Sequence, residues 1–321
     1  MRRIEPAFPD LLPISFQLGS APADSAFEPI EMRLRPSAAL SQAREGDRSI
    51  LRRPARLAVH AAVARAEREH VGRLVDRGYG LLVFLDDTCA PIDLPPPGFA
   101  AQIVVAARAS LPMWGAAGTC DLGPWVEAGY PAGVLLGLGP CHEPFEPVAA
   151  AASRAHRAGA SFLVAAPLML TPEDRHRAYE AAAGEQGDGV LEDLLFHTDL
   201  GVLMTEIERE TTRCCLRLGL AEVLPGPSTS RDTSGGFASG AELLLWARRL
   251  DLLDGVDSSG WQLRRAAHAL LASGRDPGQL VVEDNLRIVP GFNPWVEAFA
   301  RSLWSRGGPP FDEYLERWIA R

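Results

Sequence analysis

The chain has 321 residues and a formal net charge of −9, and all 32 of its basic residues are arginines. Without lysine, neither a Schiff-base lysine nor a P-loop lysine can take part in catalysis or phosphate binding. An acidic chain with no dense basic stripe is a poor nucleic-acid binder, and no apolar run is long enough to cross a bilayer. We therefore expect a cytoplasmic protein with no nucleic-acid or membrane partner.

The five cysteines do not predict a disulfide framework or a zinc ribbon. Their number is odd and no C-x-x-C spacing occurs in the sequence. Cys214 and Cys215 are adjacent in a predicted helix, where neighbouring side chains lie about 100° apart. They cannot both face one site, so we interpret them as buried core residues.

Residues 1–53 are rich in proline, which leaves little room for a long helix. Apolar residues between these prolines predict an extended N-terminal arm that packs on the body of the protein. The next segment, residues 54–77, begins with a proline and is followed by Gly78, which predicts a long helix.

Residues 54–224 alternate between apolar runs and helical patterns, with about 20–30 residues in each unit, a spacing typical of βαβ folds. We expect parallel, adjacent strands at residues 81–85, 103–107, 134–136 and 162–165, and a further strand at residues 201–204. The fold class predicted is α/β: a parallel-stranded barrel or partial barrel, TIM-like, with a mainly helical C-terminal extension.

The character of the sequence changes after Leu224, where a polar, glycine- and proline-rich segment begins. Residues 225–321 are predicted to be mainly helical. Capping boxes at residues 239–242 and 259–262 and an Asn-Pro pair at residues 293–294 predict three helix starts. Residues 280–289 predict a small hairpin that turns at Asp284 and Asn285.

Polar residues follow several of the predicted strands. The carboxyl ends of parallel strands are where α/β proteins bind ligands. The apolar run at residues 134–136 is followed by Cys141, His142 and Glu143, and Asp86 follows the strand at residues 81–85. Near the predicted strand at residues 201–204 the chain carries three more such residues, namely His197, Asp199 and Glu206.

These residues predict a site in which His142, His197 and Asp199 bind a divalent metal ion, either zinc, iron or manganese. Three carboxylates are candidate catalytic acids or bases, namely Asp86, Glu143 and Glu206. The alternative is that the carboxylates cap helices or lie in solvated turns, and that the histidines form ordinary hydrogen bonds in loops.

A second candidate site is a glycine-rich segment before a predicted helix. Backbone amides at a helix start can bind an anion or the phosphate of a cofactor. The residues are Arg231, Ser234, Gly235 and Gly236. An interdomain loop is the alternative.

The function expected is an enzyme that acts on a small molecule, such as a metal-dependent isomerase, lyase or hydrolase. The alternative is a non-catalytic barrel that acts as a partner subunit or binds a cofactor or anion. A protein partner or a homo-oligomer is compatible with both.

Overall fold

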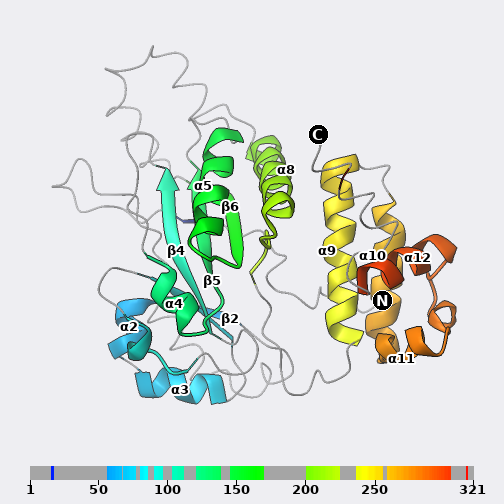
Figure 1. The fold of residues 1–321 in the computed structure, drawn as a ribbon, viewed down its shortest axis with the longest axis horizontal. Coiled ribbons are helices and arrows are strands. Elements are labelled where there is room, and N and C mark those ends of the chain that lie inside the picture. The colour runs from blue at the N-terminus through cyan, green and yellow to red at the C-terminus, as the bar shows by residue number, and fades with distance from the viewer. Residues whose placement is uncertain are drawn as a thin grey trace, which may run out of the picture. The chain divides into compact units, whose positions relative to one another are not determined.

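The computed structural model describes residues 16–17, 56–66, 68–76, 80–85, 90–96, 103–111, 121–138, 145–169, 200–224, 236–255, 259–304 and 316. These residues divide into two compact units, one within residues 13–227 and one within residues 228–321. The first unit contains the sheet and is coloured blue to lime in Figure 1, and the helices of the second are coloured yellow to red.

The α/β unit contains one parallel sheet. Its strands lie in the order β1-β6-β5-β4-β3-β2, and each neighbouring pair is parallel. The predicted adjacent, parallel arrangement of four strands is therefore confirmed. The bounds are β1 Phe16–Gln17, β2 Arg56–His60, β3 Gly80–Phe84, β4 Ile103–Leu111, β5 Ala132–Leu138 and β6 Phe162–Met169.

The described strands form an open sheet with β1 and β2 at its edges, so they do not close into a TIM barrel. From β2 to β6, neighbours in the sheet are also consecutive in the chain. Right-handed crossovers between consecutive parallel strands place their connecting helices on one face of the sheet. Ala221 continues this order: it comes after the helix at Leu200–Leu218, which follows β6 in the described chain, and forms a parallel bridge with Phe162 at the start of β6.

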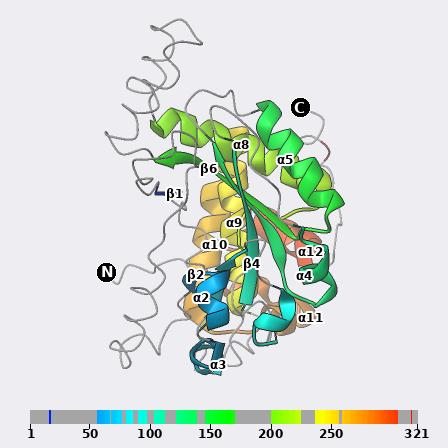
Figure 2. The same ribbon diagram turned by 90° about the vertical axis from the view of Figure 1, so that its left-hand side faces the viewer.

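The helices of this unit are α2 Ala61–Ala66, α3 Arg68–Asp76, α4 Gly123–Glu127, α5 Phe145–Arg157 and α8 Leu200–Leu218. Helices α5 and α8 lie side by side in both views of the ribbon, and α8 also packs on β6 (Figures 1 and 2). Helix α5 ends where Gly159 adopts a φ of 74°, a left-handed conformation that glycine tolerates best.

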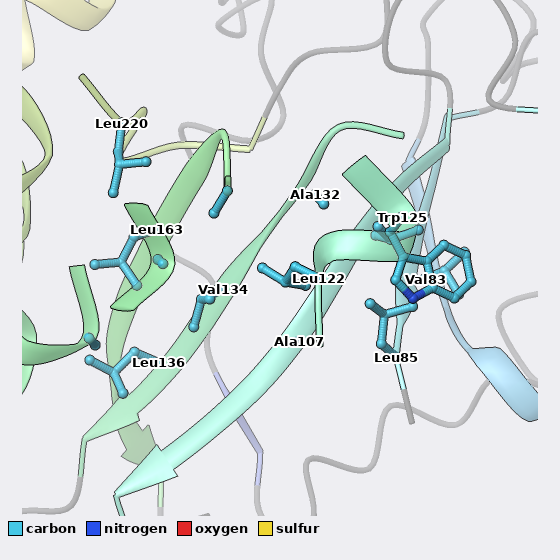
Figure 3. Packing of buried hydrophobic residues seen from close by; sticks show 14 of the residues in the cluster. Val83, Leu85, Ala107, Leu122, Trp125, Ala132, Val134, Leu136, Leu163 and Leu220 are labelled. Atoms are coloured by element: carbon cyan, nitrogen blue, oxygen red, sulfur yellow. The ribbon is translucent and has the colours of Figure 1, made fainter. Parts of the chain in front are cut away.

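Alternate residues of the strands form a core with these helices. Figure 3 shows Val83, Leu85 and Ala107 beside Leu122 and Trp125, which belong to the start and body of α4. Helices α5 and α8 contribute Ala151, Ala152, Ile207, Cys214 and Cys215 to the same core. This confirms that the two adjacent cysteines are core residues.

The opposite face of the sheet, which we call the second face, is also buried. All seven residues of β5 are buried, so both faces of this strand are covered. Leu82, Phe84, Val104, Ala106, Leu135 and Phe162 are each no more than 5% exposed and lie outside the helix-packed cluster. Burial on both faces explains why these strands are continuous apolar runs in the sequence.

Gly133 allows β5 and β6 to pack closely on the second face. A Cβ at this position would lie 2.4 Å from the carbonyl oxygen of Phe162 and 2.5 Å from its ring. Real Cβ atoms do not approach that closely, so any side chain here would push the two strands apart. Phe162 is fully buried across this glycine.

Two predictions in the α/β unit are wrong. Residues 56–60 form strand β2, whereas a helix was predicted from residue 54 onward, because pairing with β3 overrides the local helical pattern. Residues 201–204 belong to α8 and are not a strand. A short apolar run does not distinguish a strand from a buried helix segment, and here the buried positions that follow it have helical spacing.

The second unit is helical, with α9 Gly236–Asp254, α10 Gly260–Ser273, α11 Pro277–Val282 and α12 Pro294–Trp304. Helices α9 and α10 pack together over most of their length. Phe299 is fully buried and lies between two tryptophans, with ring centroids 5.9 Å from Trp246 and 5.6 Å from Trp295. The main helical character predicted for this region is present in its described residues.

The predicted hairpin at residues 280–289 is wrong, because residues 277–282 form α11 and residues 286–288 form a 3-10 helix. Asp276 caps α11 by accepting a hydrogen bond from the Gly278 amide at 2.9 Å. Asp284, where the hairpin was predicted to turn, lies between these two helices with a φ of 56°.

Of the three predicted helix starts, residues 293–294 are confirmed: Asn293 Oδ1 accepts from the Val296 amide at 2.9 Å. Ser259 occupies the N-cap position of α10 but makes no capping hydrogen bond with its side chain. Ser239 lies inside α9, which begins three residues earlier at Gly236, so it is not a cap.

Candidate functional site

Because the strands are parallel, their carboxyl ends share one edge of the sheet, where the sequence predicts the site. Strand pairing reaches Leu85, whose amide donates to the Ala106 carbonyl at 2.9 Å. Asp86 is the next residue in the chain, and His142 and Glu143 come shortly after the end of β5. Asp86, His142 and Glu143 lie outside the described residues, and Leu85 and Leu138 are the described residues that precede them.

Helix α8 runs antiparallel to β6. Near its carboxyl end, the Cys215 thiol donates to the Leu163 carbonyl at 3.7 Å, beside the start of β6. Just after the helix, the Ala221 amide donates to the Ser161 carbonyl at 3.0 Å. The helix has 19 residues and so extends about 28 Å back along β6, whose eight residues span about 26 Å. Leu200 therefore begins α8 level with the carboxyl end of β6.

Glu206 lies in the second turn of α8 and is half-buried. It was predicted to follow a strand, which is wrong, because the residues before it are helical. His197 and Asp199 precede Leu200 and lie outside the described residues. The structure therefore places one carboxylate of the predicted site on a helix that starts at the carboxyl side of the sheet.

The strand register groups the residues of the second face into rows. The first row contains His60, Phe84, Ala106, Gly133 and Phe162, which are register partners in turn across five strands. Phe84 and Phe162 are 2% and 0% exposed, so the described part of this row is apolar and tightly packed. This row closes the second face to solvent at Phe84 and Phe162.

The next two rows, closer to the carboxyl ends, differ in composition. One row contains Arg108, Leu135 and Val164. The last contains Ser110, Gly137 and Ala166. Alternation along a strand places Arg108 and Ser110 on the same face as Ala106. By register, these two rows therefore contain one charged residue, one hydroxyl residue and four small or apolar residues, at the carboxyl end of the strands.

His60, Arg108 and Ser110 lie on strands that the sequence does not predict in full. The strand containing Arg108 was predicted to end at Ala107, whereas β4 continues to Leu111. Arg108 and Ser110 therefore lie beyond the predicted strand but within β4. His60 was missed because β2 was predicted as part of a helix.

In the helical unit, Gly236 is the first residue of the 19-residue helix α9, as the predicted anion-binding segment requires. The other three residues of that segment lie outside the described residues, namely Arg231, Ser234 and Gly235.

Helix α8 also contains a buried polar cluster. Glu210 is 7% exposed and accepts hydrogen bonds from Arg213 at 2.9 Å and from the Cys214 thiol at 3.2 Å. Burial, together with the hydrogen bond to Glu210 and its negative charge, raises the pKa of Cys214 to about 12. A thiol with this pKa stays protonated at neutral pH and is a poor nucleophile, so Cys214 is structural.

Within the described ranges, no three His, Cys, Asp or Glu side chains come together as metal ligands. The three predicted ligands all lie outside those ranges, so that metal site remains a prediction. No helix among the described residues is long and apolar enough to cross a membrane.

Comparison with known proteins adds no relative to this description: no protein family matches the chain, and neither the curated proteins nor the solved structures contain a match.

Proposed function

We propose that the protein is an enzyme that acts on a small molecule at the carboxyl edge of its parallel sheet. The observation that carries this proposal is the winding of the sheet. Strands β2 to β6 are parallel and consecutive, and Ala221 continues the order next to β6. Enzymes with this winding build their sites from the loops that follow the strands.

The same winding supports a partial barrel. Helices that all lie on one face leave the other face to curl inward, where it forms the inside of a barrel. Leu82, Phe84, Val104, Ala106, Leu135 and Phe162 of the second face are buried, which is compatible with such an interior. Closure of the sheet would depend on segments beyond the described strands.

The proposed site combines three segments. Asp86 follows β3, His142 and Glu143 follow β5, and residues 197–206 lead into α8. Leu200 begins α8 level with the end of β6, which supports a common location for these segments. Asp86, Glu143 and Glu206 would serve as acid or base, and zinc, iron or manganese would be bound by His142, His197 and Asp199.

Metal content tests this proposal directly. Protein purified without chelators should contain one of these metals, and His142→Ala and His197→Ala should each lower the content while circular dichroism stays unchanged. His156→Ala is the matched control, because His156 is exposed on α5. Metal should also be lost as the pH falls through the histidine range, since only neutral imidazole binds it.

Two results would contradict the metal proposal: wild-type protein that holds no metal and gains no stability from added metal, or a control variant that loses as much metal as the other two. If the wild type holds no metal but its turnover still requires the carboxylates, the protein is an enzyme that works without a metal ion. A protein with neither bound metal nor turnover would favour the non-catalytic alternative, a partner subunit or an anion-binding protein.

A further inference from the structure

Helix α10 of the helical unit exposes one side that is apolar and positively charged, which we call the α10 stripe. It consists of Trp261, Arg265, His268, Ala269 and Ala272, which share one side of the helix by their spacing and are exposed or half-buried. Trp261 is 57% exposed, although tryptophan is strongly buried on average. Helix α10 contains no acidic residue, and no described carboxylate forms an ion pair with Arg265. The stripe therefore offers an apolar surface beside an unbalanced positive charge.

The end of α11 has the complementary composition. Val282, the last residue of α11, is 86% exposed, and Glu283 directly after it is also exposed. The Cα atoms of this pair lie about 3.8 Å apart, and the Cβ atoms of Trp261 and Arg265 lie about 5–6 Å apart on α10. Each surface thus has an apolar side chain next to a charged one, at comparable spacing and with opposite charge. At such exposure, Val282 does not cover Trp261 within one copy of the chain.

Both surfaces are held in place by hydrogen bonds within the helical unit. Beside the tryptophan on α10, Gln262 Oε1 accepts from Asn293 Nδ2 at 2.6 Å. Beside the exposed valine on α11, the Val281 carbonyl accepts from Arg301 Nη1 at 3.3 Å. Surfaces that are fixed before they associate lose less conformational entropy on binding, which favours a contact made by few side chains.

We propose that the α10 stripe binds the end of α11 from a second copy of this chain. Val282 would pack against the Trp261 indole, and the Glu283 carboxylate would pair with the Arg265 guanidinium, whose N–H groups match it. Tryptophan and arginine are enriched among the residues that carry the binding energy of protein interfaces. Because the contact is small, the association is weak, with a dissociation constant of roughly 10–100 μM, and dilute protein is monomeric.

Sedimentation velocity of the full chain, at concentrations on either side of this dissociation constant, measures the association. Wild-type protein should shift from a monomer to a larger species as its concentration rises. Trp261→Ala and Arg265→Glu should each weaken the association by about tenfold or more. Arg154→Glu is the matched control, because it reverses an exposed arginine on α5, and it should associate like the wild type. A wild type that stays monomeric overturns the proposal, and so does a Trp261 or Arg265 variant that associates as strongly as the wild type.

Two charge-reversed variants distinguish a contact between copies from a change within one copy. Arg265→Glu and Glu283→Arg should each associate poorly, because like charges then face each other. An equimolar mixture of these two variants should recover the association of the wild type, since each copy meets the opposite charge on the other. Both positions are exposed, so circular dichroism of each variant should match the wild type. A mixture that associates no more strongly than either variant alone assigns the contact to a different surface and overturns the proposal.

This proposal does not depend on the proposed catalytic role, because neither surface belongs to the α/β unit. An active, metal-containing protein that stays monomeric contradicts only the contact between copies. A protein that associates through Arg265 and Glu283 but has neither metal nor turnover contradicts only the catalytic proposal.

Discussion

The two compact units are stabilised in different ways. The α/β unit depends on apolar residues buried on both faces of a sheet and on close approach of two strands at Gly133. The helical unit combines an aromatic core with arginine–carboxylate pairs between its elements. The stability of the first unit should therefore depend mainly on the volume of its buried side chains. The stability of the second unit should depend on both side-chain volume and side-chain charge.

The charge network of the helical unit centres on Glu297 of α12. Its carboxylate accepts hydrogen bonds from Arg287 at 2.6 Å and from Arg301 at 3.0 Å. Arg301 also binds Asp284, the residue with positive φ, at 2.5 Å. These pairs connect α12 to the turn after α11, and a further pair between Arg264 and Asp251 connects α10 to α9.

The largest expected effect is the loss of Phe299. Phe299→Ala removes a fully buried ring between two tryptophans and should lower the free energy of unfolding of the helical unit by about 4 kcal/mol. Hydrogen exchange should rise in residues 236–304 and stay unchanged in β3–β6. Val282→Ala, at a side chain 86% exposed, is the control and should have little effect. Equal loss of protection in both units would show that they do not have separate cores.

The next largest effect tests the close approach of β5 and β6 at Gly133. Gly133→Ala places a methyl group within 2.5 Å of Phe162 and should cost about 3 kcal/mol, because β5 and β6 must move apart. Gly72→Ala in α3 is the matched control. No atom lies within 4 Å of its added methyl group, so this change should stabilise the unit by about 0.5–1 kcal/mol. Denaturant unfolding measures both, and a Gly133 variant as stable as the wild type would contradict the packing described.

The smallest effect concerns the charge network. Glu297→Gln should lower the stability of the helical unit by about 1 kcal/mol, since partly exposed ion pairs contribute little. Arg287 and Arg301 lower the pKa of Glu297 from its usual value. A lowered pKa means that this contribution is present above about pH 4.3, where the unfolded carboxylate is already ionised, and is lost as the pH falls through the folded pKa.

Acid unfolding at two salt concentrations measures this pH-dependent contribution of Glu297 to stability. Glu283→Gln, at an exposed position of α11's carboxyl end, is the control and should leave the acid midpoint unchanged. Glu297→Gln should remove part of the acid sensitivity of residues 236–304. The same acid sensitivity in wild type and variant would show that the network does not contribute.

The sequence predicts the strands β3 to β6 well because each is an apolar run bounded by glycine, proline or polar residues, and burial on both faces requires such a run. It predicts β2 poorly, because residues 56–60 lead into α2 without a glycine or proline between them. Their strand conformation depends on pairing with β3, more than 20 residues later in the chain. Local propensity does not contain that information.

The same limits apply to the candidate site. The apolar strands indicate where their carboxyl ends lie, so segments that contain Asp86 and His142 can be proposed from sequence. The end of β4 could not be predicted in the same way, because β4 extends four residues beyond Ala107 and includes Arg108 and Ser110, which interrupt the apolar run. The helix at α11 could have been predicted from Asp276 and Pro277, a cap followed by proline at the first helical position.

The edge of β6 that faces away from β5 pairs with two distant parts of the chain. Ala221 pairs at its amino end, and β1 pairs at its carboxyl end, through Phe16 with Leu168 and Gln17 with Met169. During synthesis β1 leaves the ribosome about 150 residues before its partner, so this pairing can form only late. Such long-range pairing slows folding, and an unpaired edge can instead bind another chain. Until both segments have paired, the edge of β6 can therefore pair with a strand of another chain.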